Sequence, residues 1–145
     1  MEDCIFCKIA AGEIPSATVY EDDTFRVILD LGPAAKGHAL ILPKRHFADV
    51  TELSEEVAAN LLPLGAKIGT AMKKGLGCTG FNLVQNNGLS AGQTVFHFHM
   101  HVIPRYEGGP EMVTWVPGSA EQEELQKTHF FHDLLQVQEI LHSNC

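Results

Sequence analysis

The sequence has few basic residues and no long apolar run. None of its uninterrupted apolar stretches approaches the ~20 residues that a membrane-spanning helix needs, so we expect no such segment. Lys and Arg number 10 against 18 Asp and Glu, and the resulting net charge of −8 disfavours electrostatic binding to nucleic acid polymers. The first residues are acidic and lack the basic start and apolar stretch of a secretory signal, which predicts a cytoplasmic location.

Acidic residues are themselves missing from the middle of the chain. No Asp or Glu occurs between Val57 and Tyr106, whereas both ends of the chain are strongly acidic. A small enclosed anion is therefore compatible with the middle region, although the total charge argues against a polymeric one. The length of 145 residues and the 45% apolar content fit one globular domain. We expect that domain to cover residues 1–110, with an extension over 111–145 that packs on it.

Cysteine is scarce as well. The four cysteines, Cys4, Cys7, Cys78 and Cys145, are too few and too unevenly spaced for a disulfide framework, and no function is assigned to the last two. Cys4 and Cys7 form a C-x-x-C pair, which can bind zinc, carry out thiol redox chemistry or fill space as two small apolar side chains. Zinc is favoured over redox chemistry, because a redox pair usually lies between a strand and a helix, and this pair opens the chain.

Apolar periodicity and turn signals predict the secondary structure. Residues 17–21 and 24–30 are rich in β-branched and aromatic types and flank an acidic turn, which indicates a hairpin. A helix is expected from Thr51 or Ser54 to about Gly75, with Pro63 able to kink it, and a second helix over residues 119–142 with Ser119 as its cap. Further strands are expected at 38–43, 81–85 and 94–103, the last ended by Pro104. These elements predict an α+β domain with an antiparallel sheet.

Three histidines alternate with apolar residues in the run His97-Phe98-His99-Met100-His101-Val102-Ile103. On a strand, the three imidazoles project from one face while the intervening residues enter the core. The first and last imidazoles are then about 13 Å apart along the strand, too far to bind one metal ion together. The three histidines therefore have separate functions, or at most two share one.

The residues before this run favour phosphate chemistry. Residues 88–94 form a Gly-rich polar segment whose backbone N–H groups are able to approach an anion closely. A neutral imidazole is a suitable nucleophile for phosphorus, and another is a suitable proton donor for a leaving group. A polar sheet face exposed to water is the alternative interpretation, and the strict alternation of the histidines argues against it.

The run resembles the mark of the histidine triad (HIT) family, His-φ-His-φ-His-φ-φ with φ apolar, and matches it at every position. The resemblance covers about residues 4–105, through the segments that begin at Ile5, Gly12, Gly37 and Gly92. It implies an α+β fold with an antiparallel sheet of about five strands, one long helix and a C-terminal helix. It also implies a homodimer that shares one continuous sheet, binds a small-molecule nucleotide and cleaves at its α-phosphate without an organic cofactor.

The resemblance implies functions for individual residues. His99 would be the nucleophile that forms a nucleotidyl-histidine intermediate, His101 would contact the phosphate or the leaving group, and His38 would orient the triad. The implied nucleotide-binding residues are the ribose ligand Asp30, the phosphate ligands Asn86, Gly92, Gln93 and Thr94, and the base-pocket residues Phe6, Phe25 and Ile28, beside His99 and His101.

A zinc site is also implied, because the chain is similar to the bacterial-type, Hint-like members that begin with C-x-x-C. The four ligands would be Cys4, Cys7, His46 and His97. Such a Cys₂His₂ set is closed to water, which makes the zinc structural. His97 would then serve the metal, and His99 would stay free for phosphorus.

Several functional hypotheses remain open at this point. The favoured one is hydrolysis or transfer at the α-phosphate of a purine nucleotide, with an adenosine 5′-phosphoramidate or a mixed nucleotidyl anhydride as substrate. Pro104 and Arg105 resemble the dinucleoside polyphosphate hydrolase branch, where the cation would lie near the phosphate chain. A third hypothesis is a nucleotide-binding scaffold with structural zinc and no catalysis, which the intact triad disfavours. Transfer of the uridylyltransferase kind is disfavoured by His101, where that branch commonly has glutamine.

The extension holds three more histidines, His129, His132 and His142. We interpret all three as surface or packing residues. The first two lie three residues apart on the expected helix, so a metal site is the less favoured alternative there.

Overall fold

The computed structural model describes residues 3–110, 118–122, 124 and 131–144. The chain divides into two compact units, Met1–Met112 and Val113–Cys145. In the described part of the chain, no helix combines the length and the apolar character needed to span a membrane.

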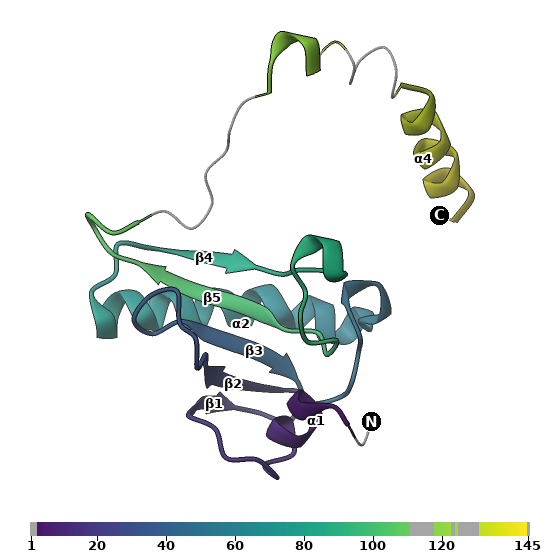
Figure 1. Ribbon diagram of the computed structural model, residues 1–145. Coiled ribbons are helices and arrows are strands. Elements are labelled where there is room, and N and C mark those ends of the chain that lie inside the picture. The colour runs from purple at the N-terminus through teal and green to yellow at the C-terminus, as the bar shows by residue number, and fades with distance from the viewer. Residues whose placement is uncertain (1–2, 111–117, 123, 125–130, 145) are drawn as a thin grey trace. The chain divides into compact units, whose positions relative to one another are not determined.

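The first unit is built on one antiparallel sheet (Figure 1). Its strands lie in the order β1-β2-β3-β5-β4, and every neighbouring pair is antiparallel. The strands are β1 (Thr18–Glu21), β2 (Phe25–Leu29), β3 (Ala39–Pro43), β4 (Gly80–Val84) and β5 (Met100–Arg105). The sequence-based prediction of an α+β fold with a five-stranded antiparallel sheet is thus confirmed.

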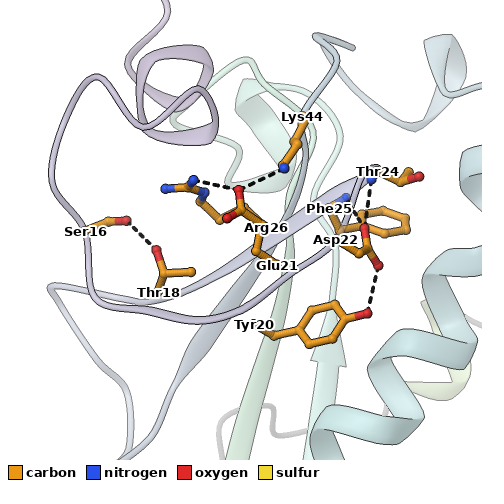
Figure 2. A network of polar contacts seen from close by, with 9 residues as sticks. All are labelled: Ser16, Thr18, Tyr20, Glu21, Asp22, Thr24, Phe25, Arg26 and Lys44. Carbon is orange, nitrogen blue, oxygen red and sulfur yellow. Dashed lines mark hydrogen bonds and ion pairs between the residues drawn. The ribbon is translucent and has the colours of Figure 1, made fainter.

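The β1–β2 hairpin turns on an acidic residue, as the sequence indicated. Asp22 Oδ1 accepts the backbone N–H groups of Thr24 and Phe25 at 2.8 and 2.7 Å, and its Oδ2 accepts the Tyr20 hydroxyl at 2.9 Å (Figure 2). An Asp side chain that satisfies N–H groups two and three residues ahead stabilises a tight turn. The turn therefore fixes which residues of β1 and β2 lie opposite each other.

A charge network ties the hairpin to the third strand. Glu21, at the end of β1, pairs with Arg26 of β2 at 2.7 Å and with Lys44, directly after β3, at 2.8 Å (Figure 2). These groups lie near solvent, so each pair contributes little to the free energy of folding. Their contribution is to hold the three strand ends in one arrangement.

The long helix α2 (Glu55–Leu76) begins after Ser54, one of the two predicted caps, and ends one residue beyond the expected Gly75. Ser54 Oγ accepts the N–H of Val57, and Gly77 ends the helix in the left-handed conformation at φ 72°. The helix is one continuous element through Pro63. It packs on β4 and β5, and Gly69 permits close approach because a Cβ there would lie 2.2 Å from the Phe81 ring.

The sheet is apolar on both faces. Alternate residues of the strands pack with α2 on one face, and this core includes Phe25, Val27, Ile41, Phe98, Met100, Val102, Leu61, Leu64 and Met72. On the other face, Ile28, Leu40 and Leu42 pack against Ile9 of the short helix α1 (Ile5–Ala10). The predicted entry of Phe98, Met100 and Val102 into the core is confirmed.

The last strand differs from the sequence-based expectation at both ends. A strand was expected over residues 94–103, but β5 begins only at Met100. Before that point the backbone is irregular, since the N–H of Phe98 donates to Phe47 O at 2.6 Å. Pro104 does not end the strand. The pairing of β3 with β5 extends only to Val102, and Pro104 therefore needs no N–H on the β3 side.

The second unit contains the helix α4 (Phe131–Asn144). The predicted cap at Ser119 is present: its Oγ accepts the N–H of Gln122 at 3.1 Å, and Gln122 Oε1 accepts the N–H of Ser119 at 2.7 Å. The expected single helix cannot be followed throughout, because residues 125–130, with His129, lie outside the described part. Packing of this extension on the first unit remains a prediction.

Candidate functional site

Two cysteines and two histidines meet at one end of the sheet. Cys4 caps α1 and Cys7 lies in its first turns, while His46 follows β3 and His97 precedes β5. The four ligand atoms all lie within 4.8 Å of one another. The structure therefore brings together the four residues that the resemblance implied as metal ligands.

The geometry of this metal cluster fits a tetrahedral zinc ion. His97 Nδ1 lies 3.4 Å from the sulfur of Cys4 and 3.4 Å from that of Cys7, and His46 Nδ1 lies 3.3 Å from the sulfur of Cys7. Zinc held at about 2.3 Å from sulfur and about 2.0 Å from nitrogen sets these two atoms about 3.5 Å apart. The three sulfur–nitrogen distances therefore match those of a tetrahedral zinc site.

Hydrogen bonds and burial prepare His97 as a ligand. Its Nε2 donates to the carbonyl oxygen of Pro43 at 2.8 Å, and a carbonyl accepts only, so the proton is on Nε2 and the lone pair is on Nδ1. Burial lowers the pKa of His97, which keeps the imidazole neutral. Burial, and next the side chain of Cys4, raises the pKa of Cys7 to about 11. A cation at this position would favour the thiolate form.

The second histidine of the triad has the opposite nitrogen free. His99 Nδ1 donates to the carbonyl oxygen of His97 at 2.8 Å. The proton must be on Nδ1 for the same reason as above, so the lone pair is on Nε2. The side chain of His99 is largely buried, with 9% of the residue exposed. An imidazole oriented in this way, with its lone pair on Nε2, is suited to nucleophilic attack.

A hydrogen-bonded chain orients the third histidine. The N–H of Ala34 donates to His38 Nδ1 at 3.0 Å, so the proton of His38 is on Nε2, which donates to His101 Nδ1 at 2.9 Å. The proton of His101 is then on Nε2, and its imidazole lies next to that of His99 with ring centroids 5.1 Å apart. These hydrogen bonds leave His101 with an N–H donor on Nε2, on a ring that lies next to the ring of His99.

A carboxylate lies beside the hydrogen-bonded pair of His38 and His101. Asp30 Oδ2 is 3.5 Å from His38 Nε2 and 4.0 Å from His101 Nδ1. These three residues are also close enough for a metal ion. The proton on His38 Nε2, which the N–H of Ala34 imposes, argues against metal binding there and for hydrogen bonding.

Burial keeps His38 and His101 neutral. Burial, and next the neighbouring His99 and His38, lower the pKa of His101 to about 4 against the opposing effect of Asp30. Burial also lowers the pKa of His38. Both imidazoles are therefore uncharged near pH 7, which leaves them as a neutral donor and a neutral acceptor.

The phosphate loop, residues 86–92, lies directly before the triad. Gly88 and Gly92 adopt left-handed backbone conformations at φ 92° and 93°, on either side of the short helix Leu89–Ala91. A Cβ at Gly92 would lie 3.9 Å from Asn86 Nδ2, so these two implied phosphate ligands are neighbours. Thr94 follows with an exposed side chain.

Gln93 does not have the free side chain that a phosphate ligand requires. Only 1% of the residue is exposed, and Oε1 accepts the N–H of Gly88 at 2.8 Å. Nε2 donates to the carbonyl oxygens of Ala48 and Val95 at 2.7 and 3.1 Å. Both amide protons are therefore in use within the protein, and the structure does not support Gln93 as a donor to phosphate.

The three base-pocket candidates lie on different faces of the sheet. The ring of Phe6 contacts His99 edge-on with centroids 5.0 Å apart, and Ile28 belongs to the cluster on the same α1 face. Phe25 belongs to the core under α2 and is 1% exposed. Alternation along β2 sends Phe25 and Ile28 to opposite faces. Phe25 is therefore not brought together with the histidines.

Arg105 points to a neighbouring strand. Its Nε donates to Asn82 Oδ1 at 2.8 Å, and its Nη1 donates to Pro110 O at 3.4 Å. Since Asn82 lies on β4, these bonds hold the guanidinium along the edge of the sheet. They give no support to a phosphate-chain contact from Arg105.

Sequence patterns missed the backbone groups that set the site. Pro43 O, His97 O and the N–H of Ala34 decide which nitrogen of each histidine is free. Every non-proline residue carries the same backbone groups, so no residue pattern marks these three. The side chain of Phe6 is different, because its position inside the C-x-x-C motif already placed it near the metal cluster.

Comparisons with known proteins identify relatives of the whole first unit. The model of the HIT domain matches residues 11–108. An adenosine 5′-monophosphoramidase of Schizosaccharomyces pombe is 45% identical over 102 residues, which are 70% of this chain and 74% of that protein.

Solved structures agree in fold. The crystal structure of a HIT family protein from Bacillus anthracis has a TM-score of 0.81 and 38% identity, and covers 99% of this chain and 98% of its own. A zinc-bound histidine triad family protein from Mycobacterium smegmatis has a TM-score of 0.74 and 36% identity, with 96% and 98% covered. On the triad, the fold and these matches, the chain belongs to the histidine triad (HIT) family.

Proposed function

We propose that this protein hydrolyses or transfers at the α-phosphate of a purine nucleotide, with an adenosine 5′-phosphoramidate as the substrate type. One observation carries the proposal: the hydrogen bond from His99 Nδ1 to His97 O leaves Nε2 of His99 free, on a ring that lies next to the ring of His101. The family includes hydrolases, among them the S. pombe monophosphoramidase described above.

The proposed reaction has two steps. In the first, His99 Nε2 attacks the α-phosphorus and forms an N–P bond, and the bond from phosphorus to the leaving nitrogen breaks as that nitrogen takes a proton from solvent, while the N–H of His101 donates a hydrogen bond to the phosphoryl group. In the second, water attacks the same phosphorus, the bond to His99 breaks, and the second proton of the water returns to solvent. The products are AMP and the free amine.

Other residues of the site hold the nucleotide. Asp30 is suited to the ribose hydroxyls, since its carboxylate lies beside the His38–His101 pair at the edge of the α1 face. Phe6 and Ile28 supply apolar surface for the base on that face. The phosphate loop offers the side-chain amide of Asn86, and Thr94 adds a hydroxyl.

The test measures AMP release from an adenosine 5′-phosphoramidate. His99→Ala is expected to lower kcat by about 10⁴-fold or more, because the nucleophile is removed. His142→Ala, an exposed histidine of the second unit, is the matched control and retains activity. Undiminished activity in His99→Ala contradicts the proposal.

The same assay decides between the remaining hypotheses. Faster turnover of diadenosine tri- or tetraphosphate than of the phosphoramidate would establish the dinucleoside polyphosphate hydrolase, for which the bonds of Arg105 give no support. Tight AMP binding without turnover of any phosphoramidate or anhydride would establish the nucleotide-binding scaffold.

The proposal includes a structural zinc bound by Cys4, Cys7, His46 and His97. The distances in the metal cluster and the zinc-bound mycobacterial relative support it. When bound, zinc would cross-link α1 to the segments after β3 and before β5. The four protein ligands fill the tetrahedron, so no position remains for a reacting group.

We also propose a homodimer. In the described part of the chain, β4 is an edge strand that pairs only with β5. Such an edge is able to continue the sheet into a second copy, and the neighbouring helix α2 exposes 62% of Leu62. Light scattering of the purified protein should give twice the mass of the chain, and a monomer at micromolar concentration would contradict this. The cytoplasmic location remains a prediction from the sequence.

A further inference from the structure

Gln93 joins two segments that are far apart in the sequence. Its Oε1 holds the N–H of Gly88 at the start of the phosphate loop. Its Nε2 reaches Ala48 O in the segment that follows β3, and Val95 O beside the triad. All three polar positions of one buried amide are thus satisfied by backbone groups of three different segments.

Further bonds join the same segments and show what the amide holds. The N–H of Val50 donates to Asn87 Oδ1 at 2.9 Å, and Asn87 and Gln85 exchange two bonds between their side-chain amides. Closer to the triad, the N–H of Phe98 donates to Phe47 O. Through these hydrogen bonds, the segment 47–50 therefore supports the phosphate loop.

The phosphate loop depends on this support. It contains glycines in left-handed conformations, and such residues lose more conformational freedom on ordering than any others. A loop of this kind binds an anion well only if it is ordered before the anion arrives. Gln93 lies outside the loop, and its side-chain amide bonds directly to the loop backbone at Gly88.

We propose that Gln93 is a positioning residue that holds the phosphate loop in its anion-binding form without touching the nucleotide. The inference rests on the proposed function, because it concerns the loop that would receive the α-phosphate. It assigns to Gln93 an indirect contribution to phosphate binding, whereas the resemblance had implied a direct one.

The decisive variant is Gln93→Glu, studied as a function of pH. A protonated carboxyl group keeps the acceptor for Gly88 N–H and one donor for Ala48 O, but an ionised carboxylate faces two carbonyl oxygens with no proton. Burial among these acceptors raises the pKa of the introduced carboxyl, so the neutral form persists to higher pH than in water. The variant should therefore work at low pH and fail as the pH rises.

The probe is AMP, with affinity measured by calorimetry from pH 5.5 to 8 on the full-length protein. Relative to the unmodified protein at each pH, Gln93→Glu should bind AMP about tenfold more weakly at pH 8 and within about twofold at pH 5.5. The KM of the phosphoramidate should change in parallel, with a smaller change in kcat. Gln93→Leu should be weak at every pH, and the exposed Gln138→Glu should match the unmodified protein throughout.

Three results would overturn the proposal. The first is wild-type affinity of Gln93→Glu at pH 8, and the second is an equal loss at all pH values in the Glu and Leu variants. The third comes from the unmodified protein and needs no folded variant. The side-chain NH₂ protons of Gln93 should exchange slowly with solvent before and after AMP is added, and fast exchange or a large shift on AMP binding contradicts an internal amide.

A failure of the proposed function would look different. The unmodified protein would then neither bind AMP nor release it from a phosphoramidate. The exchange of the Gln93 amide protons would still report whether the loop is held as described.

Discussion

His97 and His99 are two residues apart, yet they present opposite nitrogens. His97 donates from Nε2 to Pro43 O and keeps Nδ1 for the sulfurs, whereas His99 donates from Nδ1 to His97 O and keeps Nε2 for the open side. In each case a backbone carbonyl selects the tautomer. The chemistry available to each of these imidazoles is thus set by which of its nitrogens is bonded to the backbone.

The surroundings of His97 and His99 differ as well. The metal cluster around His97 is completed by Cys4, Cys7 and His46, which close it. His99 has the ring of His101 as a neighbour, and within the described residues its Nε2 has no hydrogen-bond partner. Loss of a residue from the closed cluster should therefore reduce stability, and loss of His99 or of a residue that orients His101 should reduce turnover.

The largest expected effect in the closed cluster is that of Cys7→Ser. The variant should lose its zinc, and its free energy of unfolding should fall by about 3 kcal/mol or more, because a cross-link between three segments disappears. Metal content per chain and urea unfolding measure the two effects. Cys145→Ser is the matched control and should keep one zinc per chain.

Turnover should respond differently from stability in this variant. The folded fraction of Cys7→Ser should retain far more activity than His99→Ala, which in turn should keep its zinc. If Cys7→Ser keeps one metal ion per chain, the ligand assignment is wrong. If His99→Ala loses the metal, the two sites are not separable and the comparison fails.

A smaller effect is expected when the hydrogen bond that orients His101 is removed. His38→Ala removes the N–H that donates to His101 Nδ1, so kcat should fall about tenfold, the equivalent of one neutral hydrogen bond. His38→Gln places an amide N–H near the same position and should restore most of the rate. Steady-state kinetics with the phosphoramidate measures both variants. Equal losses in the two variants would contradict orientation through this hydrogen bond.

The last expected effect is on stability as a function of pH. Burial, then His99 and His38, lower the pKa of His101 to about 4, while in the unfolded chain it is about 6.5. Between these values the unfolded chain binds more protons, so the stability from His101 is fully present above pH 6.5 and is lost as the pH falls towards 4. The loss at pH 5 should be about 2 kcal/mol.

Urea unfolding at pH 7.5 and pH 5 tests this dependence. The comparison with His101→Gln under the same metal conditions isolates one histidine, since protonation of the metal ligands acts equally in both proteins. The variant should lose less stability on acidification than the unmodified protein. Parallel losses would show that His101 does not titrate as its burial requires.

The sequence predicts the five strands and the long helix of the first unit, though not the short helix α1, for a physical reason. Residues such as Asp22 and Ser54 act on backbone groups two or three positions away, so their effect is local and visible in the sequence. The start of β5 is not local. It is fixed by the bond between Phe98 and Phe47, which joins segments about fifty residues apart.

The sequence predicted which residues lie near one another better than it predicted where their side chains point. The residues implied as metal ligands do meet, but Gln93 and Phe25 point away from the site that the resemblance gave them. A glutamine amide serves a phosphate or a carbonyl equally well, and a phenylalanine suits either face of a sheet. Only the surrounding packing decides between these uses.

The pairing of the strands has a consequence for the order in which the protein opens. β2 and β3 share five residue pairs, as do β4 and β5, whereas β3 and β5 share three, as do β1 and β2 at the edge. The join between β3 and β5 is thus a short one inside the sheet, and the hydrogen bond from His38 to His101 lies across it. Amide hydrogens of Ala39 and Ile41 should exchange before those that join β2 to β3 and β4 to β5, and a nucleotide bound at the histidines should slow their exchange.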